Sequence, residues 1–268
     1  MRHIRLFAAS LAALAVLALA VAPAAAGWEP GDAYKMHYPQ LPDPNGWDVN
    51  FTFGRLADDW QCTGTGPVSG IHFWFSMHED YIAELKSIYV GIHANDTSGQ
   101  FSKLGELLWE RRFERLWDEP FEGFQYEIRP YGTGAQGFYD VLWGGVYPDN
   151  HQNYYQANIT DIQSPFWQEE GTVYWLELSV VTESGRAGWK TSASQQFMDR
   201  AVYGATIYAP PVWSKLYDPS IQYTRHPFSG DFAFVITTVP EPSTFIIWSL
   251  LGALGITVGW WRRRSHDG

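Results

Sequence analysis

Cysteine is almost absent from this 268-residue chain, in which Cys62 is the only one. An intrachain disulfide is therefore excluded, and stability must come from a buried core. A lone cysteine is most often a small buried apolar residue, which is the role we expect for Cys62. The region 27–239 holds 11 Trp and 15 Tyr, whose large rings can build such a core.

Positive charge is also scarce. Residues 27–239 contain 13 Lys and Arg against 27 Asp and Glu, so their formal charge is −14. Such a surface repels nucleic acid and anionic lipid, which we exclude as partners of this region. The acidity suits either solubility or contact with extracellular cations.

The motifs of the common catalytic sites are missing. No Gly-x-Ser-x-Gly elbow occurs, and the glycine-rich run Thr63–Gly66 lacks the Lys-Ser/Thr pair of a phosphate-binding loop. His72, His78 and His93 do not have a zinc-site spacing. We therefore predict a protein that is not an enzyme. A glycan-active hydrolase is the enzymatic alternative, and it requires two carboxyl groups about 5–10 Å apart across a groove.

Helical periodicity is missing too, and alternation of apolar and polar residues takes its place. The segments 68–76, 87–93, 123–129, 172–182 and 231–239 each put apolar side chains on one face, and turn-forming clusters separate them. The segment 102–115 suits a helix or a strand equally well. The pattern predicts an all-β fold, an antiparallel, jelly-roll-like sandwich forming one domain over residues 50–239. Residues 27–49, rich in Pro and Gly, are expected to be an irregular lead-in.

The N-terminal residues 1–26 have the pattern of a secretory signal peptide. Arg2 and Arg5 precede an apolar run, and Ala24 and Ala26 form the small-residue site that signal peptidase cleaves. Cleavage is expected after Ala26. A retained N-terminal anchor is the alternative.

Near the C-terminus, residues 245–261 form a 17-residue run without charge. As a helix it would be about 25 Å long, the short end of what spans a bilayer. Trp248, Trp260 and Trp261 lie near its ends, and three arginines follow, which predicts a transmembrane helix with a cytoplasmic C-terminus. The alternative is a helix buried in the domain core.

Residues 240–268 combine three ordered features: the motif Pro240-Glu241-Pro242, the apolar run, and the cluster Arg262-Arg263-Arg264. This tail resembles the PEP-CTERM sorting signal of exported proteins from Gram-negative bacteria that make extracellular polysaccharide. The resemblance implies that the partner is exosortase, which is thought to remove the tail. It also implies a membrane-anchored precursor, exported across the inner membrane, that ends at the cell surface or in the extracellular matrix.

Several internal segments resemble an uncharacterised secreted domain that is often joined to such tails. The resemblance implies a β-sandwich and no assigned activity. The segments are Leu56-Ala57-Asp58-Asp59-Trp60-Gln61-Cys62, Gly66-Pro67-Val68, Ile71-His72-Phe73-Trp74, Gly105-Glu106-Leu107-Leu108-Trp109, the run 166–176, Gly188-Trp189-Lys190-Thr191-Ser192, and Asp231-Phe232-Ala233-Phe234-Val235-Ile236.

Two sets of residues are candidates for binding. Asp58 and Asp59, just ahead of a glycine-rich turn, are candidate Ca²⁺ ligands, with turn capping as the alternative role. Five tryptophans in polar surroundings are candidates for stacking on sugar rings: Trp28, Trp47, Trp117, Trp143 and Trp213. The alternative is a structural role in which these indoles fill the core. No other cofactor is expected.

The sequence thus predicts an exported, non-enzymatic surface or matrix protein that binds extracellular polysaccharide. A structural or adhesive module without glycan affinity is the main alternative. The identity of the ligand and the oligomeric state are left open.

The sorting hypothesis predicts a change in mass. Protein recovered from the native host should lack the mass of roughly residues 243–268, because exosortase would have removed the tail. Intact-mass spectrometry of the surface fraction measures this loss. A mature protein that keeps Arg262, Arg263 and Arg264 would instead be anchored by an uncleaved helix.

Overall fold

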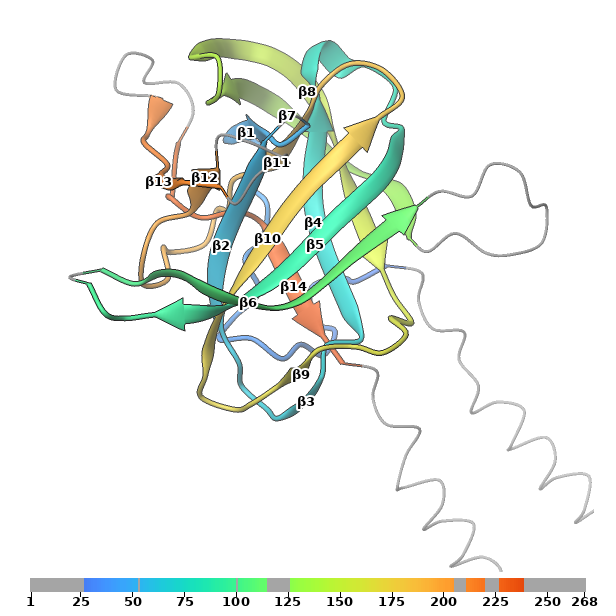
Figure 1. The fold of residues 1–268 in the computed structure, drawn as a ribbon. Coiled ribbons are helices and arrows are strands. Elements are labelled where there is room, and N and C mark those ends of the chain that lie inside the picture. The colour runs from blue at the N-terminus through green and yellow to red at the C-terminus, as the bar shows by residue number, and fades with distance from the viewer. Residues whose placement is uncertain are drawn as a thin grey trace, which may run out of the picture.

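The computed structural model describes residues 27–52, 54–99, 101–114, 126–204, 211–219 and 227–238, and these form an all-β fold (Figure 1). One short 3₁₀ turn, η1 (His78–Asp80), lies wholly within these residues. The strands are β1 (Trp47–Asn50), β2 (Arg55–Gln61), β3 (Gly66–Pro67), β4 (Gly70–Met77), β5 (Leu85–Asp96), β6 (Lys103–Glu114), β7 (Glu127–Asp140), β8 (Gly145–Ile159), β9 (Trp167–Gln168), β10 (Val173–Thr182), β11 (Ala187–Lys190), β12 (Val202–Gly204), β13 (Trp213–Lys215) and β14 (Phe234–Thr237).

The predicted strands are largely confirmed. β4, β5, β10 and β14 coincide with four of the alternating segments, and β7 begins within a fifth. The ambiguous segment 102–115 is a strand, β6, paired along its length with β5. The lead-in 27–49 is irregular until Trp47, where β1 begins three residues before the predicted start of the domain at residue 50. Cys62 is buried, as expected.

Two six-stranded sheets face each other across the core. One has the order β13-β12-β2-β10-β5-β6, and we call it the open sheet. The other has the order β11-β1-β7-β8-β4-β14, and β11 also pairs with β4. That extra pairing closes β11, β1, β7, β8 and β4 into a ring, which we call the barrel.

The prediction of a purely antiparallel sandwich was wrong at one place, because β1 and β7 pair in parallel, with Asp48 opposite Phe138. The physical reason is that β1 inserts between β11 and β7 to complete the barrel, which fixes its direction. The jelly-roll arrangement is not confirmed by these strand orders.

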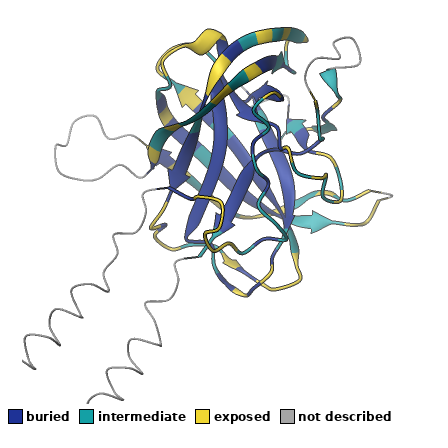
Figure 2. Ribbon diagram, turned by 180° about the vertical axis from the view of Figure 1, so that it is seen from behind, coloured by how far each residue is buried: buried dark blue, intermediate teal, exposed yellow. Residues whose placement is uncertain are grey.

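An aromatic core lies between the open sheet and the barrel wall. Trp189 is its centre: its ring stacks on Phe232 with centroids 4.4 Å apart and meets Phe73 and Phe234 edge to face. Aliphatic residues of the open sheet, such as Leu176 and Ile92, close the core from the other side. Figure 2 shows the central strands almost wholly buried, whereas the β7–β8 hairpin also carries intermediate and exposed residues.

The interior of the barrel is polar. Each of its five strands contributes one buried side chain, and we call these the barrel cluster: Asp48, Ser76, Gln136, His151 and Lys190. The Lys190 ammonium is 3.0 Å from Asp48 Oδ2 and also donates to Gln136 Oε1. His151 Nε2 lies 3.0 Å from the same Asp48 oxygen, and Ser76 Oγ donates to Gln136 at 3.1 Å. The Lys190–Asp48 pair joins the neighbouring strands β11 and β1, whereas the other three bonds join strands that are not neighbours and so cross the lumen.

The terminal predictions lie outside the described residues. This holds for the signal peptide with Ala24 and Ala26, for the helix 245–261, and for the sorting motif with its arginines. Within the described ranges, no helix has the length and apolar character needed to cross a membrane.

The barrel cluster predicts a large stability effect. Lys190→Met should lower the free energy of unfolding by about 3–5 kcal/mol, because it leaves the buried Asp48 carboxylate without its cation. Urea unfolding of the full-length protein measures the difference. The matched control is Lys86→Met, whose exposed partner is Glu183 and which should cost less than about 1 kcal/mol. Equal costs for the two variants would contradict this account.

His72 predicts acid sensitivity. Burial lowers the pKa of His72 from 6.5 to about 4, even though the hydrogen bond to Asn158 opposes the shift. The charge of Arg129 adds to the lowering, Asp32 opposes it, and Thr237 meets the other ring nitrogen. Because the unfolded chain binds this proton more tightly, stability present above pH 6.5 should fall by about 3 kcal/mol as the pH drops to 4.

Urea titrations at pH 4.5, 5.5, 6.5 and 7.5 measure this slope. In His72→Gln, the free energy of unfolding should depend less steeply on pH than in the natural protein, because one fewer proton is taken up on unfolding. Parallel curves for the two proteins would show that His72 does not carry the effect.

Candidate functional site

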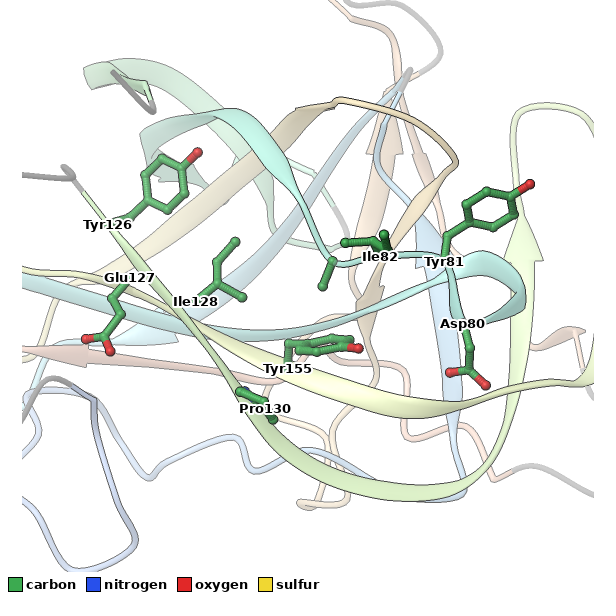
Figure 3. Close-up of a pocket in the computed structure, with 9 residues that line it drawn as sticks. Asp80, Tyr81, Ile82, Tyr126, Glu127, Ile128, Pro130 and Tyr155 are labelled. Atoms are coloured by element: carbon green, nitrogen blue, oxygen red, sulfur yellow. The ribbon is translucent and has the colours of Figure 1, made fainter. Parts of the chain in front are cut away.

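A groove of about 550 Å³ opens where the chain passes from the barrel to the open sheet. One wall is the segment between β4 and β5, with Asp80, Tyr81 and Ile82. The other wall is formed by Tyr126, just before β7, and by Glu127, Ile128 and Pro130 of β7, and Tyr155 of β8 lies across the floor (Figure 3). We call it the tyrosine groove.

The first wall is held in an unusual backbone conformation. Glu79 and Asp80 have φ values of 58° and 52°, a left-handed region that costs non-glycine residues about 1–3 kcal/mol each. The Asp80 carboxylate offsets this cost by accepting bonds from the main-chain N–H groups of Gln152 and Asn153, the latter at 2.8 Å. The Asn153 amide adds a further bond at 3.0 Å. The turn is thereby fixed onto β8.

The turn leaves two apolar side chains in solvent. Tyr81 is 52% exposed and Ile82 is 79% exposed, and both border the groove. Aromatic and aliphatic side chains presented in this way beside a cavity are typical of a binding surface.

The opposite wall is held in place by a buried hydrogen bond. Tyr126 is buried, and its hydroxyl donates a 2.6 Å hydrogen bond to the carbonyl of Leu85, which links the residue before β7 to β5. On the floor, the Tyr155 ring packs against Phe75 of the core with centroids 5.7 Å apart. The groove is therefore a formed feature of the fold.

A second hollow of about 360 Å³ continues from the groove along the β7–β8 hairpin. The two share Pro130 and Tyr155, and the second adds Tyr131 and Tyr154. The pairing of β7 with β8 shifts register between Pro130 and Gly132, so Tyr131 is an extra residue in the strand. Such bulges re-aim side chains.

The combined surface contains no basic residue among the described residues that line it. Asp80 and Glu127 supply carboxylates, and they lie at opposite ends of the groove in Figure 3. Burial, followed by the charge of Asp80, raises the pKa of Tyr155. Burial also raises the pKa values of Tyr131 and Tyr154, so these hydroxyls remain protonated hydrogen-bond donors at neutral pH.

A second ionisable cluster lies on the outer face of the open sheet. The Glu177 carboxylate accepts from Arg55 at 2.8 Å and contacts His93 Nε2 at 2.6 Å. His93 Nδ1 faces the carbonyl of Gly105 at 3.3 Å. Both carboxylate oxygens and both ring nitrogens are engaged within the cluster, which ties β2, β5 and β10 together.

The predicted tryptophan face does not form. Trp28 of the irregular lead-in and Trp47 of β1 are buried, so they have the alternative role of core residues and are not available to stack on sugars. Trp143 is 76% exposed in the β7–β8 turn, Trp213 is partly buried on β13, and neither lines the groove. Trp117 lies outside the described residues.

The predicted calcium ligands Asp58 and Asp59 do not face one common site. Asp58 and Asp59 are buried in the middle of β2 rather than in a turn, so adjacent side chains point to opposite faces. Asp58 accepts main-chain bonds from Phe232 at 2.6 Å and from Asp59 at 3.0 Å. Among the described residues, no three His, Cys, Asp or Glu side chains are placed to hold one metal ion.

Sequence reasoning missed the tyrosines of the groove. The alternation at 123–129 indicates a strand that contains Tyr126, but no local signal indicates that this strand borders a hollow with Tyr81 and Tyr155. Those residues are brought together by the crossing from β4 to β5 and by the pairing of β7 with β8.

Neither the curated proteins nor the solved structures contain a match to this chain. A comparison with protein families finds one over residues 36–237, a span that includes all the described strands and the whole tyrosine groove. The chain therefore belongs to the family described as Domain of unknown function (DUF7901).

Proposed function

We propose that this protein is an exported, non-enzymatic surface or matrix protein that binds neutral segments of an extracellular polysaccharide in the tyrosine groove. The observation that carries the proposal is the continuous surface of the groove and the second hollow, lined by tyrosines and free of basic side chains among its described residues. Aromatic rings stack on the C–H faces of sugars, and protonated phenols with amides bond sugar hydroxyls.

The shape favours a polymer over a small molecule. Two adjoining hollows share one wall residue and one floor residue, so an extended chain is able to occupy both. The lack of basic residues among those lining them disfavours phosphorylated or strongly anionic ligands.

The arrangement of carboxylates supports binding rather than hydrolysis. Asp80 is already the acceptor of bonds from Gln152 and Asn153, which hold the turn in place. Glu127 lies at the other end of the groove in Figure 3, so the two acids do not form a closely facing pair.

The proposed location rests on the ends of the sequence. A signal peptide cleaved by signal peptidase after Ala26 would direct export, and the tail 240–268 would anchor the precursor in the inner membrane until exosortase acts. The surface of a Gram-negative bacterium or its polysaccharide matrix would be the final location.

Affinity electrophoresis of the full-length protein in gels that contain exopolysaccharide from the native host tests the binding proposal. Tyr81→Ala and Tyr155→Ala should each weaken retardation roughly tenfold, because each removes a stacking ring. Trp143→Ala is the matched control: this ring is more exposed than Tyr81 but lies outside the groove, so retardation should be unchanged.

No retardation of the natural protein would favour a structural or adhesive module instead. Loss of binding in Trp143→Ala, with the tyrosine variants unaffected, would place the site elsewhere. Release of new reducing ends from the polysaccharide would favour the hydrolase.

A further inference from the structure

Four buried oxygen atoms on one side of the core lack a hydrogen-bond donor. Both carboxylate oxygens of Asp59, Oδ1 of Asp231 and the amide oxygen of Gln40 have no partner, and all three side chains are at most 1% exposed. Burying such acceptors without partners costs several kcal/mol unless something else satisfies them.

These oxygens belong to one cluster. Gln40 uses its amide nitrogen to bond Asp231 Oδ2 at 3.3 Å, which places the unpartnered Oε1 beside the same carboxylate. The second bond to Asp231 Oδ2 comes from the main-chain N–H of Phe197 at 2.6 Å. Asp231 and Asp59 act on each other electrostatically, and Asp58 joins them through its bond to the N–H of Phe232.

This cluster has no salt bridge to a cation: among the described residues, no Lys, Arg or His forms one with Asp59 or Asp231. The charge of Arg200 acts on Asp231 without forming such a bridge, and it opposes the rise that burial causes in the pKa of that carboxyl. Burial and then the charge of Asp231 raise the pKa of Asp59 to about 9. The N–H of Asp199 approaches Asp59 and opposes this rise, but without the geometry of a full hydrogen bond.

We propose that Asp59, Asp231 and Gln40 bind a Ca²⁺ ion. The donor set is made only of oxygen, which hard cations prefer, and its two carboxylates balance one divalent charge. An amide oxygen is a common calcium ligand beside carboxylates. Asp58 is not a ligand, because both of its oxygens already accept main-chain bonds.

The ion would join three distant parts of the chain. Gln40 belongs to the irregular lead-in, Asp59 to β2, and Asp231 to the segment that leads into β14. An ion held by all three would fasten the lead-in to both sheets. Extracellular modules bind Ca²⁺ with dissociation constants of about 10⁻⁴–10⁻³ M, which is sufficient in the exported location proposed above.

Thermal unfolding of the full-length protein tests the site. After treatment with EDTA and dialysis, 10 mM CaCl₂ should raise the Tm of the natural protein by roughly 3–10 °C, as mass action predicts for that affinity. MgCl₂ at the same ionic strength should have a much smaller effect, because Mg²⁺ loses its water reluctantly. Isothermal titration calorimetry should give one Ca²⁺ per chain.

Asp59→Asn and Asp231→Asn should each abolish the calcium-dependent rise in Tm. Asp58→Asn is the matched control: it changes the neighbouring buried carboxyl and should keep the rise. If one asparagine variant fails to fold, the other and the natural protein still decide the question.

Several results would overturn the proposal. A natural protein with no calcium response would do so, and so would an equal response to Mg²⁺ or a response retained in both Asp59→Asn and Asp231→Asn. None of these outcomes depends on glycan binding, which is measured separately with the tyrosine variants.

Discussion

The ion pair between Lys190 and Asp48 is the constraint on which the rest of this fold depends. Both side chains are fully buried, and such a pair depends on further hydrogen bonds around it. Gln136 and His151 supply these bonds from two further strands, and Ser76 secures Gln136 from a fifth, while Asp48 Oδ1 has no hydrogen-bond partner among the described residues. The pair itself lies between the neighbouring strands β11 and β1, and the bonds from Gln136 and His151 reach it across the closed barrel.

Barrel closure also sets the rest of the architecture. Trp189 precedes Lys190 on β11 and points to the opposite face, where it centres the aromatic core shared with the open sheet. One strand thus carries the polar lumen on one side and the apolar core on the other. Because β4 belongs to the barrel and β5 to the open sheet, the chain must cross between them, and the strained turn at Glu79 and Asp80 makes that crossing. The tyrosine groove lies at this crossing.

The two proposed sites differ in whether their carboxylates are hydrogen-bonded within the protein. In the tyrosine groove, Asp80 is fully engaged by β8, and the surface offered to a ligand consists of rings, hydroxyls and amides. At Asp59 and Asp231, three of the four buried carboxylate oxygens lack a donor, which is why we propose an ion there. The groove is suited to a weak, extended ligand, and the carboxylates to a structural cation that holds the lead-in against the sheets.

The sequence by itself determined the all-β class, most strand positions, the burial of Cys62 and the acidic surface, because alternation and composition are local properties of the chain. It also gave the hypotheses for both termini, which stay predictions. Only the tertiary structure decided that residues 103–114 form a strand, that Trp28 and Trp47 are buried, and that Asp58 and Asp59 are buried on opposite faces of β2. It likewise decided the groove, since Tyr81, Tyr126 and Tyr155 are far apart in sequence and meet through strand pairing and barrel closure. The sequence specifies the type of each side chain. The neighbours of a buried or groove-lining residue are set by long-range strand pairing, which no local pattern encodes.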